Sequence, residues 1–141
     1  MTQEDKQLLL KDLCGRLPHK VVVDYGYNAF DVHNGNYVKH GSKCILTCYL
    51  LDIFMSPRQN EKGEYIKPYL RPMSSMTEEE KKEYESLCIL IPVNYDSDLS
   101  KYDYYTTDSI DSFDWLNIHH FDYRGLIEKG LALEAPEGMY N

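Results

Sequence analysis

The side chains best able to do chemistry lie in one short stretch, WLNIHHFDYRG, residues 115–125. His119 and Asp122 are three residues apart. On a helical turn they could meet as a general base with its orienting carboxylate, or as two ligands of one metal ion. The adjacent His120 would point elsewhere. One hypothesis is therefore an enzyme or metal protein centred on His119, His120 and Asp122, assisted by the tyrosine or arginine that follows.

The same three residues also have a purely structural interpretation. Aspartate is a preferred N-cap, so Asp122 could begin a following helix. His119 and His120 would then end the preceding helix, where positive charge suits the helix dipole. No third ligand and no nucleophile can be identified nearby. Both interpretations stay open, and the sequence assigns no catalytic residue, no metal site and no cofactor.

A second candidate is the acidic, tyrosine-rich stretch from Asn94 to Trp115, where six aspartates accompany a single lysine. Aromatic side chains supply contact area and carboxylates steer the encounter with a basic partner. A mimic of nucleic-acid phosphate is an alternative, and so is a solvated loop with half-buried tyrosines. The residues expected to contact a partner are Tyr102, Asp103, Tyr104, Tyr105, Asp108 and Asp111.

Two prolines mark the middle of the chain. Pro68 and Pro72 predict an extended, rigid connector over residues 67–76, because proline fixes its own φ and restricts the residue before it. Tyr69 and Arg71 lie between them and could be held rigidly for a partner. They complete the set of predicted binding residues.

Four cysteines are present, two of them in the apolar segment KCILTCYLLDIF. We interpret this segment as a strand, on which Cys44 and Cys48 would lie about 13 Å apart, too far for one zinc ion or a disulfide. Both are then expected to be buried structural residues. On a helix they would share a face and could chelate a metal. Because no leader is recognisable at the N-terminus, we expect reduced thiols and a cytoplasmic protein.

Composition and motifs argue against several function classes. The net charge is −8, from 15 basic and 23 acidic residues, and no basic cluster is evident, which disfavours direct nucleic-acid binding. No apolar run approaches the roughly 20 residues of a membrane span. Residues 35–43, GNYVKHGSK, are similar to a phosphate loop but have five residues between the glycines. We expect neither an established catalytic motif nor a cofactor.

The elements that must position these residues point to one α+β domain spanning residues 1–141. We expect an N-terminal helix, a small antiparallel sheet that could curl into a partly open barrel, and C-terminal helices. The predicted zones are a helix over 3–14, strands over 20–66, the connector over 67–76 and helices over 77–131, the last at about 78–90, 112–119 and 123–129.

Local signals support these boundaries. Thr2 with Asp5, and Thr77 with Glu80, have the spacing of a capping box, in which each side chain satisfies a backbone amide of the other. Residues 33–36, HNGN, contain the Asn-Gly signal of a tight hairpin turn.

Three segments resemble an uncharacterised family of short proteins from gut Bacteroidales and their phages or integrated elements: KPYLRPMSSMTEEEKKE, WLNIHHFDYRGLIEKGLALEAPEGMY and LLLKDLCGRLP. The resemblance implies no activity, cofactor or catalytic residue. It implies a phage or mobile-element setting, in which the expected partner is a host protein. Together these observations predict a small, non-enzymatic binding protein, with a DNA mimic and a His119-centred enzyme or metal protein as alternatives. The oligomeric state is not predicted.

Overall fold

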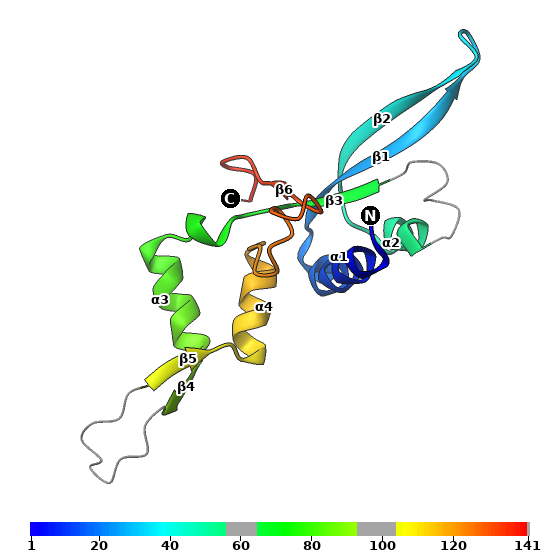
Figure 1. Cartoon of the computed structure of the whole chain (residues 1–141). Coiled ribbons are helices and arrows are strands. Elements are labelled where there is room, and N and C mark those ends of the chain that lie inside the picture. The colour runs from blue at the N-terminus through cyan, green and yellow to red at the C-terminus, as the bar shows by residue number, and fades with distance from the viewer. Residues whose placement is uncertain (56–64, 93–103, 141) are drawn as a thin grey trace, which may run out of the picture.

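The computed structural model describes residues 1–55, 65–92 and 104–140, and the statements below refer to these ranges. It confirms the predicted α+β class (Figure 1). The elements are α1 (Gln3–Arg16), the 3-10 helix η1 (Leu17–His19), β1 (Val22–Asp31), β2 (Asn36–Ile45), α2 (Cys48–Met55), β3 (Tyr65–Leu70), the 3-10 helix η2 (Met73–Ser75), α3 (Glu78–Leu87), β4 (Ile89–Pro92), β5 (Tyr104–Thr107), α4 (Ile110–Ile118) and β6 (Leu133–Glu134).

The main sheet has the strand order β2-β1-β3-β6. β1 pairs antiparallel with β2 and β3, whereas β6 runs parallel to β3 at Tyr69 and Leu70. β3 pairs with β1 only from Val23 to Gly26, so the outer half of the β1–β2 hairpin projects beyond the sheet as an arm. Figure 1 shows this arm and the β4–β5 hairpin pointing in opposite directions. The sheet is open, with β2 and β6 at its edges.

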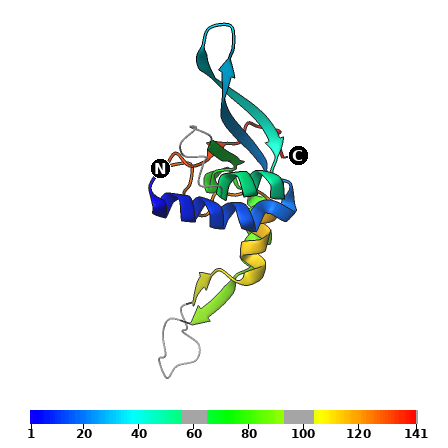
Figure 2. The same cartoon turned by 90° about the vertical axis from the view of Figure 1, so that its right-hand side faces the viewer.

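The main core lies between the sheet and helices α1 and α2, which lie side by side (Figure 2). It includes Leu9 and Leu13 of α1, Leu50 of α2, and Val23 and Ile66 of the sheet. A smaller core of Trp115, Leu116 and Phe121 packs against α3. The two cores meet along the segment that follows β3.

Several local predictions are confirmed. Both capping boxes form, at Thr2 with Asp5 and at Thr77 with Glu80. The Asn-Gly turn joins β1 to β2, and Gly35 takes a positive φ of 71°, which glycine adopts without a steric penalty.

In the described ranges, no helix is both long enough and apolar enough to cross a bilayer.

The strand predicted over the apolar segment around Cys48 is wrong. Residues 48–55 form α2, and the Thr47 hydroxyl accepts a hydrogen bond from the amide of Leu50 at its start. Leu50, Leu51 and Phe54 face the core with helical spacing. A short apolar run fits a helix or a strand equally well, and tertiary packing decides between them. Cys48 is exposed, so its predicted burial is also wrong.

The predicted connector over residues 67–76 is wrong in its first half. Pro68 lies within β3 and is buried. It is the last β3 residue paired with β1, and the pairing with β6 begins at the next residue. Proline has no N–H to donate to a neighbouring strand, and Pro68 lies where the pairing of β3 with β1 ends and its pairing with β6 begins.

Helix boundaries differ from the predictions in three places. α1 continues through Gly15 to Arg16, because Gly15 lies directly against Asn117 of α4, where an added Cβ would be 3.3 Å from the amide nitrogen. α3 ends at Leu87, and the predicted end of the helix is instead strand β4, paired with β5. Residues 123–129 form turns, with Gly125 at a φ of 69°, so the last predicted helix is absent from this described segment.

Candidate functional site

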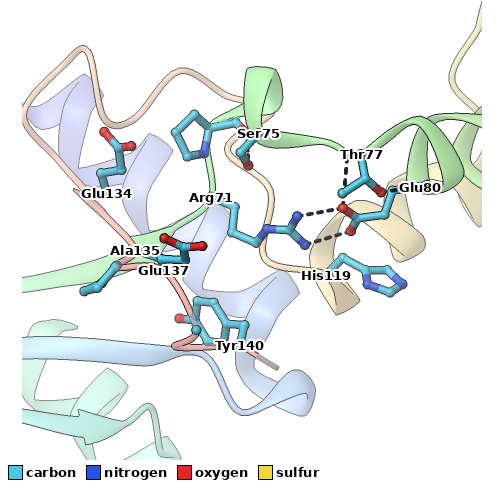
Figure 3. A pocket seen from close by; sticks show the side chains of 12 residues that line it. Arg71, Ser75, Thr77, Glu80, His119, Glu134, Ala135, Glu137 and Tyr140 are labelled. Carbon is cyan, nitrogen blue, oxygen red and sulfur yellow. Dashed lines mark hydrogen bonds and ion pairs between the residues drawn. The ribbon is translucent and has the colours of Figure 1, made fainter.

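A polar pocket of about 640 Å³ lies where the end of β3, the start of α3, the end of α4 and the C-terminal segment meet (Figure 3). We call it the Arg71 pocket. Its lining includes Arg71, Glu80, His119, Glu134, Glu137 and Tyr140. It therefore brings together one residue of the predicted binding pair and one of the predicted catalytic group.

Arg71 is fixed at the floor of the pocket. Its Nη1 and Nη2 atoms donate to the two carboxylate oxygens of Glu80, each at 2.8 Å. The guanidinium also lies 4.2 Å from the ring centroid of Phe121. Its backbone amide donates to the carbonyl of His120, and its carbonyl accepts from the amide of Asp122. Arg71 is held rigidly, as the sequence suggested, but its charge is neutralised within the chain.

Glu80 performs two tasks at once. Its carboxylate pairs with Arg71 and also accepts a hydrogen bond from the backbone amide of Thr77, as the cap of α3. The hydrogen bonds from Arg71 are the main cause that lowers the pKa of Glu80 to about 2, assisted by the cap. Glu80 therefore stays ionised at every pH near neutrality.

His119 ends α4 and lies beside the Arg71–Glu80 pair (Figure 3). Its ring centroid is 4.2 Å from that of Trp115. This position at the C-cap of α4 agrees with the structural interpretation of the sequence. The imidazole is half-buried and lines the pocket, so it can offer a ligand a flat ring face.

His120 points into a different environment. It takes a positive φ of 63°, is only 7% exposed and stacks on Tyr140 at 3.8 Å between ring centroids. Burial, assisted by the positive charge of Arg16, lowers the pKa of His120 to about 4. The imidazole is therefore neutral at pH 7. Its role is to pack the C-terminal segment against the body of the protein.

Asp122 is buried, and its carboxylate serves the backbone. It accepts hydrogen bonds from the amides of Leu126 at 2.8 Å and Ile127 at 2.9 Å. Asp122 thus closes a turn instead of starting the predicted helix. His119, His120 and Asp122 have three separate roles, and within the described part of the chain no three His, Cys, Asp or Glu side chains are grouped to hold a metal ion.

Two of the residues predicted to contact a partner form hydrogen bonds within the chain. Tyr69 is 9% exposed, and its carbonyl accepts a hydrogen bond from the hydroxyl of Tyr140 at 2.7 Å. Asp108 accepts hydrogen bonds from the hydroxyls of Tyr84 and Ser112. The prediction of surface contact is wrong for Tyr69, because its side chain is buried, whereas Asp108 is only partly buried and its contact with a partner stays a prediction.

The remaining residues of the tyrosine-rich stretch are only partly described. Asp111 is exposed in the first turn of α4. Tyr104 and Tyr105 belong to β5, but their side chains lie outside the described set. Tyr102 and Asp103 lie wholly outside the described residues. Their predicted contact with a partner therefore stays a prediction.

The sequence analysis missed three residues of the pocket. Glu134 and Glu137 are exposed and flank Pro136. Tyr140 accepts a hydrogen bond from the amide of Val22 at 3.0 Å and donates to Tyr69, and burial raises its pKa to about 12. The repeated acidic residues around a proline, EAPE, were a weak signal for an exposed acidic turn. Nothing in the sequence indicated that this turn would meet Arg71.

Carboxylates outnumber cationic side chains in the Arg71 pocket. It contains three carboxylates and one guanidinium, which is already paired. Its hydroxyl groups are engaged as well, since the Ser75 hydroxyl donates to the carbonyl of Pro72 and the Thr77 hydroxyl caps α3. The pocket therefore has a surplus of negative charge and suits a cationic group.

Comparison with known proteins gives no further guide: no protein family matches the chain, and neither a curated protein nor a solved structure is similar to it.

Proposed function

We propose that the protein is a non-enzymatic binding protein whose Arg71 pocket receives a cationic side chain of a partner protein. The observation that supports this most directly is the arrangement of the carboxylates. Glu134 and Glu137 are exposed at the pocket, while Arg71, which supplies the only guanidinium among the described lining residues, is paired with Glu80. An entering arginine or lysine thus meets unpaired carboxylates.

Arginine fits the site better than lysine. Its planar guanidinium can bind a carboxylate through two parallel hydrogen bonds and can stack on a ring. The pocket offers carboxylates together with the half-buried imidazole of His119. The net charge of −8 would also attract a basic partner over a distance of roughly 8–10 Å at ordinary salt.

The proposed partner is basic, as the sequence predicted, but its main contact is the Arg71 pocket instead of the acidic, tyrosine-rich stretch. The acidic, tyrosine-rich stretch remains a possible extension of it through Asp111, which is exposed. The phage or mobile-element setting and the host partner rest on the sequence resemblance alone and remain predictions.

A defined basic peptide tests the proposal. We expect an acetylated, amidated peptide of sequence GRGRGRG to bind the protein in a calorimetric titration, and Glu134→Gln with Glu137→Gln to weaken binding roughly five- to tenfold. The matched control is Glu83→Gln with Glu128→Gln, which removes the same charge at exposed positions away from the pocket. Equal weakening by both pairs would mean that net charge alone attracts the peptide, and the proposal would be wrong.

A further inference from the structure

A second charged surface lies on the outer face of the main sheet. Lys39 of β2 and Lys67 of β3 lie near Tyr65, and Lys43 of β2 lies near Tyr69. We call the three lysines and Tyr65 the lysine face. The Nζ atoms of Lys39 and Lys67 lie 5.1 Å and 5.9 Å from the ring centroid of Tyr65, and that of Lys43 lies 5.1 Å from the ring of Tyr69. The sequence analysis expected no basic cluster, which is wrong, because strand pairing brings together lysines that are far apart in the chain.

The lysines retain their charge for a ligand. Among the described residues, none of the three forms an ion pair with a carboxylate. Lys39 and Lys43 are exposed, and β2 itself contains no acidic residue. Asp24 of β1, paired directly with Lys43 and Lys67, places one carboxylate among the three lysines, so the surface keeps an excess of positive charge in a chain whose net charge is −8.

Two glycines shape the lysine face. Gly26 and Gly41 are directly paired across β1 and β2. The Tyr65 ring lies flat over Gly26, where an added Cβ would come within 2.0 Å of it, and its hydroxyl donates to Asp24 at 3.2 Å. An added Cβ at Gly41 would approach only to 3.5 Å. The atoms that it would meet are a carboxylate oxygen of Asp24 at 3.5 Å and the hydroxyl of Tyr65 at 3.8 Å, so the surface over Gly41 is bordered by these two polar groups.

The backbone of β2 is also open at this point. β2 is an edge strand of the described sheet, and its first eight residues are exposed. The amide of Leu46 donates to the carbonyl of Val21. In an antiparallel pair of strands, every second residue is hydrogen-bonded to the facing strand, so this bond fixes which residues of β2 bond to β1. By this alternation, Lys39, Gly41 and Lys43 turn their own N–H and C=O groups away from β1, toward the free edge.

We propose that β2 binds an acidic extended segment of a partner protein as an added antiparallel strand. Hydrogen bonds to the backbone of Lys39, Gly41 and Lys43 would place the facing residues of the partner on the same side of the sheet. Carboxylates four residues apart then lie opposite the two lysines. The residue between them lies over Gly41, where the hydroxyl of a tyrosine could donate to the carboxylate of Asp24. The recognised pattern is acidic-x-aromatic-x-acidic.

The charges and the exposed edge of β2 favour this occupant over two others. A second copy of the chain, added through its own β2, would bring four lysines onto one edge, and like charges across strands repel. Nucleic acid would meet the same lysines, but it has no peptide backbone to pair with the exposed edge of β2. An acidic peptide has the required charge and can also pair with the exposed strand edge.

Peptide binding at low salt tests the proposal. We expect a labelled peptide of sequence TETYTET to bind in fluorescence anisotropy, and its glutamine version TQTYTQT to bind at least fivefold more weakly. Lys39→Gln with Lys43→Gln should weaken TETYTET by a similar factor. The matched control is Lys81→Gln with Lys82→Gln, which removes the same charge from exposed positions on α3. If the control pair weakens binding as much, the lysine face is not the site.

Backbone methylation of the peptide separates strand addition from simple charge attraction without altering the protein. N-methylation of the two glutamates and the tyrosine should weaken binding tenfold or more, because these amides face Lys39, Gly41 and Lys43. N-methylation of the three threonines that precede them should be tolerated. Equal effects would overturn strand addition. Stronger binding of oligothymidine than of TETYTET at the same salt would show that the lysine face prefers nucleic acid, and would also overturn the proposal.

Discussion

Two arginine–carboxylate pairs of this molecule, Arg16 with Asp12 and Arg71 with Glu80, differ most in their contact with solvent. Arg16 and Asp12 are four residues apart in α1, and both side chains are 0% exposed. Arg16 also donates to the carbonyl of Phe121 at 2.6 Å. Arg71 and Glu80 connect the end of β3 to the first turn of α3, and their side chains are 23% and 19% exposed.

The difference indicates which pair serves structure alone and which borders a site. Arg16 has no route to a ligand, and its bond to Phe121 ties α1 to the C-terminal part of the chain. The backbone of Arg71 is also hydrogen-bonded to the C-terminal part of the chain, at His120 and Asp122, but its side chain faces the pocket. The chemistry of the two pairs is the same. Their burial decides whether the charge can meet a partner.

The largest effect is expected from the buried pair. Arg16→Met leaves the carboxylate of Asp12 in the core without its main partner, and we expect it to lower the free energy of unfolding by about 3–5 kcal/mol in chemical denaturation. Lys11→Met, on an exposed position of the same helix, is the control. Arg16→Met with Asp12→Leu should lose less than Arg16→Met alone, because no buried carboxylate is left, and the second partner of Asp12, Arg124 at 3.4 Å, has a side chain that is 23% exposed. A loss below about 1 kcal/mol for Arg16→Met would contradict the structural role.

A smaller effect is expected from Arg71. Arg71→Ala removes a two-bond ion pair and the contact with Phe121, and we expect a loss of about 1–3 kcal/mol. Arg71→Lys should recover only part of it, since lysine lacks the planar fork. The same denaturation experiment on Lys82→Ala provides an exposed control. Full recovery by lysine would show that charge alone, and not geometry, holds the floor of the pocket.

Acid stability should reveal the Arg71–Glu80 pair directly. The pKa of Glu80 falls from 4.5 to about 2 on folding. A depressed carboxyl pKa stabilises the folded state above pH 4.5, and this contribution is lost as the pH falls toward 2. Unfolding of Glu80→Gln should therefore show a shallower pH dependence than the wild type across this window, by on the order of 1 kcal/mol. Parallel curves for the two proteins would place Glu80 outside the ion pair.

The smallest effect on stability is expected at the rim of the pocket. Glu134→Gln with Glu137→Gln changes two exposed side chains, so the free energy of unfolding should stay within about 0.5 kcal/mol of the wild type. The same variant should lose affinity for the basic peptide. Loss of stability together with affinity would mean that these glutamates support the fold, and the contrast with the buried pair would disappear.

Features set by neighbouring residues were predictable from the sequence. The two capping boxes and the Asn-Gly turn depend on spacings of a few residues, and each formed as expected. α2 and the end of α3 were missed because tertiary pairing overrode ambiguous local patterns. Pro68 within β3 was missed because the change of strand partner that tolerates it is not visible in the sequence.

The candidate site was less predictable than the fold. His119 and Arg71 were singled out separately, and only the fold brings them to one pocket with Glu134, Glu137 and Tyr140. The lysine face was hidden for the same reason, since a net charge of −8 gives no sign of how cations gather across strands. Residues that meet through long-range contacts leave no fixed spacing to recognise.

The central claim is that a cationic partner occupies the Arg71 pocket, and amide NMR spectra of the labelled protein during titration with GRGRGRG test it most directly. We predict that the largest shift changes map to Arg71, His119, Glu134 and Glu137 and saturate together, while the amides of Gly41 and Lys43 stay unchanged. Shift changes that saturate elsewhere, or small changes spread evenly over the acidic surface, would contradict the claim.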